Sequence, residues 1–173
     1  MAPEQAKPPL VLSNLVTSPG DVSRVKRELT ALEEYMQMQR LREPGTPIDR
    51  LPKLSRMLDD LAQVNAINLL HESARRELEQ FIDDLAARAP VVHLSFAADP
   101  SSASLQKLVL WLRQNIGPNV LVNVGLQPNI VAGCVMRTTN RYFDFSLKHY
   151  LTERRNFLVE ALKPAQPSEE PAR

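Results

Sequence analysis

The sequence predicts an α+β protein in which a helical hairpin or small helical bundle precedes a small mixed β-sheet domain with covering helices. Two observations lead to this class. Over residues 10–90, apolar side chains recur every three or four positions, which is the period of amphipathic helices. Over residues 91–146, short β-rich runs and two-residue alternation take over, which is typical of strands with one buried face.

Proline-rich and polar stretches divide the 173 residues into four segments. Residues 1–9 and 164–173 have the composition of a disordered arm and a disordered tail. Residues 10–90 form the predicted helical N-terminal domain, and residues 91–163 form the predicted C-terminal α/β domain. The first of these domains has eleven Lys and Arg against thirteen Asp and Glu, and the second has eight against four. This asymmetry suggests two modules with different partners.

The first helix is predicted to begin at Ser18-Pro19, where Ser18 can cap it and a Pro suits the first helical position. It should end at residues 42–45, where Arg-Glu-Pro-Gly interrupts the pattern. Its buried stripe is expected to comprise Val22, Val25, Leu29, Leu32 and Met36. Residues 53–89 contain neither Gly nor Pro. They are predicted to form one long helix, or two that break near the Asn residues of 65–68, packed antiparallel to the first.

A strand and a crossover helix are predicted to open the sheet domain. The strand covers Val91–Phe96, and the helix begins near residues 99–102 and ends at about Ile116, before Gly117-Pro118. The buried face of this helix should comprise Leu105, Leu108, Val109 and Leu112. A second strand follows directly, so the two strands are expected to be parallel and joined by a right-handed crossover.

The rest of the sheet is predicted within Asn119–Ser146, read as NVLVNVGLQPNIVAGCVMRTTNRYFDFS. In its first run, Val120, Val122, Val124 and Leu126 alternate with Leu121, Asn123 and Gly125, as expected for one well-buried face. Residues 127–129 interrupt the run with a Pro, residues 130–137 form a second strand, and Tyr142–Phe145 form a third after a short polar loop. A last helix should then be locked onto the sheet by Phe143, Phe145, Leu147, Leu151, Phe157, Leu158 and Leu162.

Sites for cofactors, metals and catalysis are not predicted. The five glycines are scattered singly, so neither a P-loop nor a dinucleotide fingerprint can be written. His71, His93 and His149 lack metal-ligand spacing, and Cys134 is expected to be core packing. No apolar run approaches the ~20 residues of a membrane-spanning helix, and the N-terminus lacks a signal-peptide pattern. We therefore expect a soluble, non-enzymatic protein without cofactors.

Three small residues of the sheet region are candidate structural or interaction residues. Gly133 could mark a bulge or a place where another backbone or side chain approaches closely, or it could simply lie beneath Phe145 or Trp111. Asp144 and Ser146 precede the last helix, where side-chain oxygens satisfy unpaired amides. Capping is the interpretation that we prefer for these two residues.

Two further groups could contact a partner. Trp111 and Arg113, on the crossover helix, belong to residue types that are enriched at binding hot spots, although a single Trp is also common in a partly buried core. Five basic residues on the hairpin and last helix could face RNA or an acidic helix, or could form an ordinary solvated surface. These residues are Arg137, Arg141, Lys148, Arg154 and Arg155.

Residues 91–162 resemble the C-terminal domain of the delta subunit of bacterial rotary ATP synthases, the family of the oligomycin-sensitivity-conferring protein. That family has an apolar strand, a Pro-containing turn, a Gly-Gly in the next strand, a hairpin, and an Asp-x-Ser before the final helix. The matching residues here are Val120–Val124, Pro128, Ala132-Gly133, Asp144-Phe145-Ser146 and Leu147–Leu162. Ala132 stands where the family has its first Gly. Residues 10–90 depart from the family, because they are shorter than its six-helix N-terminal bundle and lack its Tyr-Ala-x-Ala-Leu-like motif.

The resemblance implies a non-catalytic stator subunit that links the catalytic head of ATP synthase to the peripheral stalk and supports proton-driven ATP synthesis. In that family the N-terminal domain binds the alpha-subunit N-termini, and the C-terminal domain holds the C-terminal helices of the b subunits. It also implies a cytoplasmic protein, peripheral on the cytoplasmic face of the membrane through the synthase complex. The alternative is a small nucleic-acid-binding module that uses the basic hairpin and helix, although a GxxG loop is absent from the sequence.

Overall fold

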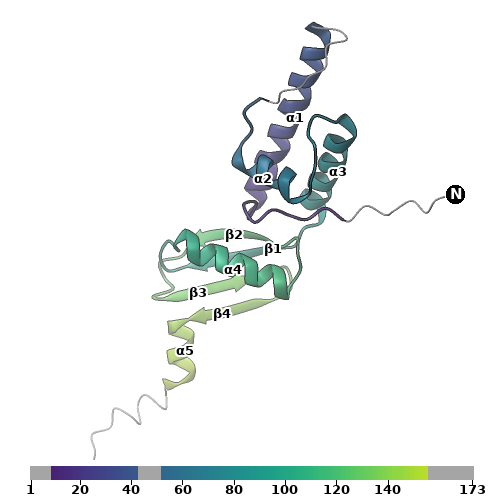
Figure 1. Cartoon of the computed structure of the whole chain (residues 1–173). Helices are drawn as coiled ribbons and strands as arrows, with labels where there is room; N and C mark the ends of the chain where they lie inside the picture. The colour runs from purple at the N-terminus through teal and green to yellow at the C-terminus, as the bar shows by residue number, and fades with distance from the viewer. Residues whose placement is uncertain (1–8, 43–51, 156–173) are drawn as a thin grey trace, which may run out of the picture. The chain divides into compact units, whose positions relative to one another are not determined.

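A computed structural model describes residues 9–42 and 52–155 of the chain (Figure 1). Within them the protein has five helices and a four-stranded mixed sheet, which confirms the predicted α+β class. Contacts between residues divide the chain into two compact units. The first unit comprises the described residues up to His93 together with Pro100–Asn123, and the second comprises Leu94–Asp99 together with the described residues from Val124 onward.

The first helix, α1 (Pro19–Arg42), begins where its capping residues predict. Ser18 Oγ accepts a hydrogen bond from the amide of Asp21 at 3.1 Å, and Asp21 Oδ2 accepts one from the amide of Ser18 at 3.0 Å. This reciprocal pair is a capping box, which satisfies two amides that the helix itself leaves unpaired. All five residues of the predicted stripe are buried: Val22, Val25, Leu29, Leu32 and Met36.

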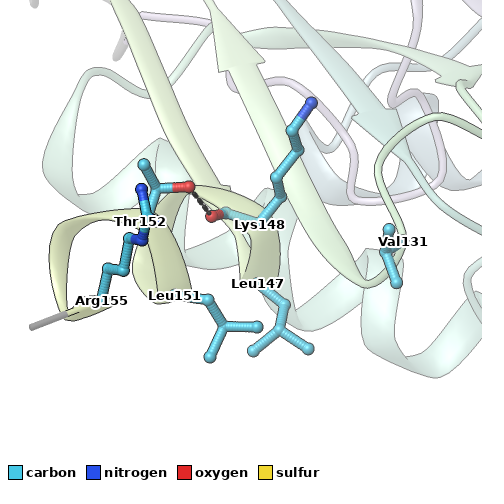
Figure 2. Close-up of a pocket in the computed structure, with 6 residues that line it drawn as sticks. All are labelled: Val131, Leu147, Lys148, Leu151, Thr152 and Arg155. Carbon is cyan, nitrogen blue, oxygen red and sulfur yellow. Dashed lines mark hydrogen bonds between the residues drawn. The ribbon is translucent and has the colours of Figure 1, made fainter. Parts of the chain in front are cut away.

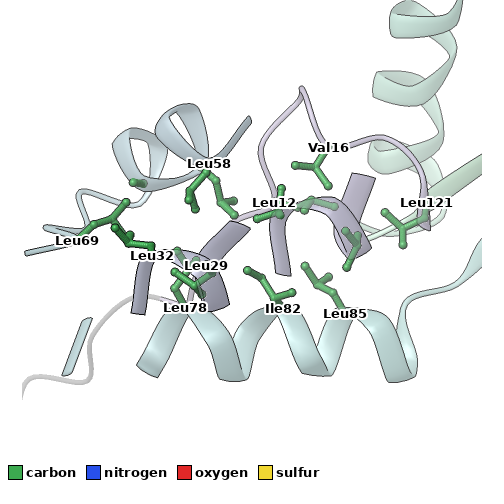
Figure 3. Close-up of a cluster of buried hydrophobic side chains, with 14 of the residues drawn as sticks. Leu12, Val16, Leu29, Leu32, Leu58, Leu69, Leu78, Ile82, Leu85 and Leu121 are labelled. Atoms are coloured by element: carbon green, nitrogen blue, oxygen red, sulfur yellow. The ribbon is translucent and has the colours of Figure 1, made fainter. Parts of the chain in front are cut away.

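Residues 53–89 form two helices, α2 (Arg56–Val64) and α3 (Glu72–Arg88), rather than one. The break lies at Asn65, which caps the C-terminus of α2, and at Ala66, which has a left-handed φ of +51°. Helix α1 packs against both α2 and α3. Their apolar faces share one core, so the helical part is a small bundle (Figure 3).

A strand, a helix and a second strand follow: β1 (Val91–Phe96), α4 (Ser102–Asn115) and β2 (Leu121–Leu126). Leu121 N donates to Pro90 O at 3.0 Å, and Gln127 N donates to Phe96 O at 2.8 Å. The two strands therefore start together and end together, which confirms that they are parallel.

The predicted single buried face of β2 is wrong. Val120, Leu121 and Val122 are all buried, whereas Val124 and Leu126 are 37% and 61% exposed. The reason is that Leu121 belongs to the same apolar cluster as the helical bundle, so the start of the strand is covered on both faces (Figure 3).

The buried face of α4 is narrower than predicted, because Val109 and Leu112 are buried while Leu105 and Leu108 are half-buried.

The hairpin consists of β3 (Gly133–Arg137) and β4 (Tyr142–Ser146), which pair antiparallel. Thr138 N donates to Arg141 O at 2.8 Å and closes the loop where a hairpin was predicted. The strand order is β2-β1-β3-β4, so β2 and β4 are the two edges of the sheet. β3 is shorter than the predicted run of residues 130–137, because it begins only at Gly133.

The last described helix, α5 (Leu147–Glu153), has no buried residue. The prediction that it is locked onto the sheet is therefore wrong for the described residues: Phe145 is 60% exposed, Leu147 43% and Leu151 41%. The other predicted anchors, Phe157, Leu158 and Leu162, lie outside the described residues, as does the predicted tail. These apolar side chains are therefore exposed and could contact a partner.

The division of the chain also differs from the predicted boundary at Pro90. Helix α4 and the starts of β1 and β2 group with the helical bundle in the first unit. The second unit contains the ends of β1 and β2, the hairpin and α5. The physical cause is the core itself, since Leu121 packs in the same buried cluster as residues of α1, α2 and α3.

Candidate functional site

The site is built on a close approach between Gly133 and the end of β4. Gly133 has a φ of +94°, in the left-handed region that favours glycine. A Cβ at this position would collide with the carbonyl oxygen of Phe145 and lie 3.1 Å from the Cα of Ser146. The close approach at Gly133, which was one of the predicted alternatives, is therefore made by backbone atoms. The side chains of Phe145 and Trp111 do not make it.

Three hydrogen bonds fix the start of α5 at this same point. Leu147 N donates to Ala132 O at 2.9 Å, so the residue before Gly133 holds the first residue of the helix. Ser146 Oγ accepts from the amide of His149 at 3.2 Å, which is the N-cap bond. Asp144 Oδ1 accepts from the amide of Ser146 at 2.8 Å, and hydrogen bonds from Ser146 lower the pKa of the Asp144 carboxyl. The predicted cap is therefore Ser146, whereas Asp144 holds the amide of that cap residue and bonds no amide of α5 itself.

Helix α5 presents an open apolar hollow of about 390 Å³ (Figure 2). Leu147 and Leu151 project from one side of the helix toward it, and Val131, which is 75% exposed, contributes from the loop before β3. The remaining lining comes from Lys148, Thr152 and Arg155. A hollow lined by leucines and rimmed by cations suits an amphipathic segment, because apolar side chains enter it while acidic ones meet the rim.

Edge strand β4 adds an aromatic surface that the sequence interpretation assigned to the core. The rings of Phe143 and Phe145 stack with their centroids 6.1 Å apart and an interplanar angle of 8°. Phe143 is 36% exposed, and Tyr142 on the same strand is 64% exposed. The composition of the strand was the feature of the sequence that could have indicated this surface. Tyr-Phe-Asp-Phe is unusually aromatic in a chain whose aromatic content is only 5%.

The basic residues predicted as a binding surface are all exposed on the hairpin, on α5 or directly after it: Arg137, Arg141, Lys148, Arg154 and Arg155. The guanidinium of Arg154 lies 4.9 Å from the centroid of the Tyr150 ring, a cation–π geometry. His149 Nε2 lies 3.4 Å from Glu153 Oε1 within the same helix. Apolar and cationic side chains are therefore exposed in the same region. We call the exposed side chains of Phe143, Phe145, Leu147, Lys148, Leu151 and Arg155 the α5 surface.

Trp111 and Arg113 take different roles on α4. Trp111 is 52% exposed and remains available to a partner. Arg113 instead turns inward: its guanidinium donates to the backbone oxygens of Ser13 at 3.0 Å and Val16 at 2.5 Å. Burial lowers the pKa of Arg113. It therefore acts inside the first unit, and nothing in its contacts points to an external ligand.

Within the described ranges, no group of three His, Cys, Asp or Glu side chains could hold a metal ion. His93 is exposed on β1, and His71 precedes α3 without a side-chain cap bond. Burial raises the pKa of the Cys134 thiol, which leaves it less reactive than a free thiol. No described helix is long and apolar enough to cross a membrane. The neighbouring carboxylates Asp83 and Asp84 have different partners: Asp83 pairs with Lys26 at 2.6 Å, and Asp84 pairs with Arg88 at 3.4 Å.

No protein-family model matches the chain, and no curated protein matches its sequence.

Proposed function

We propose that the protein is a non-catalytic stator subunit of the delta type, which links the catalytic head of an ATP synthase to its peripheral stalk and so supports proton-driven ATP synthesis. The observation that supports this best is that both halves of the family-like pattern meet in space. Gly133 faces Ser146 across the hairpin, and Ala132 holds Leu147. Residues that are separated along the sequence form one junction, so a single structural requirement explains why they occur together.

The α5 surface is the proposed stalk-binding face. A partner helix with an apolar stripe and acidic flanks would place its apolar side chains against Leu147 and Leu151 and its carboxylates near Lys148 and Arg155. The proposed occupant is the C-terminal helix of the b subunits. The N-terminal helical bundle is the proposed site for the alpha-subunit N-termini. Through these partners the protein would lie on the cytoplasmic face of the membrane.

The test is binding of the full chain to a peptide with the C-terminal residues of the cognate b subunit. Leu151→Glu places a charge in the hollow and should weaken binding at least about tenfold, since a buried unpaired charge is costly. Leu110→Glu is the matched control, because Leu110 is also a helix leucine and is also 41% exposed. Equal affinity of both variants and the parent chain, or no binding by the parent chain, would contradict the proposal.

A second candidate function, single-stranded nucleic-acid binding, is favoured by the stacked rings of Phe143 and Phe145 on β4, the strand that exposed Arg141 directly precedes. Bases stack on exposed aromatic rings, and arginines neutralise phosphates. Counterion release makes such binding fall steeply with salt, with a slope near −3 for about four phosphates on a single strand. Apolar docking of a helix depends much less on salt. We expect negligible RNA or DNA binding at physiological salt; tight binding with that slope, and no peptide binding, would make this second function the better one.

A further inference from the structure

The segment before α1, residues 10–17, is fastened to helix α2. The amide of Val11 donates to Asn65 Oδ1 at 2.6 Å, and Asn65 Nδ2 donates back to Val11 O at 2.9 Å. Ser13 Oγ bonds the carboxylate of Asp60. Between these polar contacts, Leu12 and Val16 are buried in the core of the bundle (Figure 3). The segment is therefore part of the helical bundle although it has no regular secondary structure of its own.

The same segment is also fastened to α4 and β2. Arg113 reaches from α4 with two nitrogens, Nη1 to Ser13 O and Nη2 to Val16 O. Val122 N, on edge strand β2, donates to Thr17 O at 2.7 Å. Charge-assisted hydrogen bonds of this kind are stronger than neutral ones, and a bidentate guanidinium fixes direction as well as distance.

We propose that residues 10–17 are a strap that joins the helical bundle to α4 and the start of β2, with Arg113 as its latch. Along the chain only Ala89 and Pro90 connect α3 to β1, which alone would make a short hinge. The strap bypasses this linker with hydrogen bonds, and it adds to the packing of Leu121 in the core of the bundle. The inference is that residues 89–90 do not act as a hinge, and that the first unit unfolds cooperatively.

This inference does not rest on the proposed function, because it concerns contacts within the first unit alone. Such a strap would matter in any protein that transmits force between two partners. A hinge would absorb a torque as bending, whereas a doubly connected unit passes it on. For a stator, the strap would keep the bundle from rotating against α4 within the first unit.

Two optical probes can test the strap on the full chain without any partner. Trp111 is the only tryptophan and lies on α4, so its fluorescence follows that helix. Far-UV circular dichroism follows mainly the 24, 9 and 17 residues of α1, α2 and α3. Coincident transitions by different probes are a signature of two-state unfolding. We expect the two thermal midpoints of the parent chain to coincide.

Arg113→Met keeps the aliphatic stem and removes the latch, so it should lower the fluorescence midpoint by about 4 °C or more and separate it from the dichroism midpoint. Arg113→Lys, which keeps the charge but loses the bidentate geometry, should give an intermediate separation and carries the test if the Met variant does not fold. Arg154→Met removes an arginine that caps the C-terminus of α5 and lies over Tyr150, and it should change neither midpoint. Separate midpoints in the parent chain, or unchanged midpoints in both Arg113 variants, would overturn the strap. Peptide binding is measured independently, so either result leaves the proposed function to its own test.

Discussion

Gly133 and Ser146 are partners across the β3–β4 hairpin, and their backbones come so close that no side chain fits on the first of them. The contact is backbone against backbone, so a larger residue could not be accommodated by a change of rotamer. Ser146 is at the same time the N-cap of α5. The glycine therefore sets the point at which the sheet ends and the helix begins.

Gly133→Ala is expected to destabilise the protein by more than about 2 kcal/mol, because it adds both a clash with Phe145 O and a left-handed φ that an L-residue rarely adopts. The measurement is urea unfolding of the full chain. Gly117→Ala is the control: no atom lies within 4 Å of a Cβ built there, and the change should stay within about 0.5 kcal/mol. Similar effects of the two substitutions would show that the close approach carries no cost.

Ser146→Ala should lower the free energy of unfolding by about 1 kcal/mol, because the amide of His149 loses its cap. The loss should be local to α5, so hydrogen exchange at His149 should accelerate more than exchange at Leu112, which is one of the buried residues of α4. Ser146→Asp keeps an oxygen acceptor at the cap and should retain slow exchange at His149. Fast exchange in the Asp variant would argue against the capping role.

Glu33 forms an ion pair with Arg75, whose side chain is only 2% exposed. The hydrogen bond from Arg75 lowers the pKa of Glu33, so the pair stabilises the fold above the ordinary carboxyl value of about 4.3. This contribution is lost as the pH falls through the depressed pKa. Glu33→Gln should cost about 2 kcal/mol at pH 7, since it leaves a buried guanidinium without its carboxylate.

The pH profile of unfolding separates this effect from a general loss of packing. Between about pH 5 and pH 3, stability should fall more steeply in the parent chain than in Glu33→Gln. Glu72→Gln is the control, since its contacts with Arg40 and Arg76 are at the exposed surface and little change is expected. Parallel pH profiles for Glu33→Gln and the parent chain would contradict the assigned role of the pair.

Ala66 has a φ of +51° in the turn after α2. An L-residue pays roughly 1–2 kcal/mol for that conformation, whereas glycine adopts it freely. Ala66→Gly should therefore stabilise the protein by up to about 1 kcal/mol after the greater chain entropy of glycine is counted, as measured by thermal unfolding. A loss of stability would mean that the methyl group of Ala66 makes a packing contribution that exceeds the strain.

Local patterns predicted the elements of this fold well. The stripe of α1 is confirmed at every position, β1 has its predicted bounds, and the hairpin loop closes where polar residues stand. These features depend on residues near one another in sequence, so their signals are local. The sequence could not decide whether residues 53–89 form one helix or two, because the break depends on the left-handed turn at Ala66.

Features that depend on distant partners could not be predicted. The burial of Leu121 comes from helices some thirty-five to a hundred positions earlier, so the alternation along β2 could not indicate that the start of the strand is buried on both faces. Arg113 looked like an interface residue, because nothing near it in sequence indicates that it bonds Ser13 and Val16. The apolar residues of β4 and α5 were assigned to the core since hydrophobicity alone does not distinguish a core from a binding surface.

The exposed leucines and aromatic rings of the α5 surface have a consequence for the protein before it meets a partner. A copy that is newly made carries Phe145, Leu147 and Leu151 in contact with water. Contiguous apolar surface of this kind promotes aggregation and recognition by chaperones and proteases. Copies in excess of their partner would be removed while assembled copies persist. Under the proposed function, the same side chains would thus also match the cellular amount of this protein to the amount of its partner.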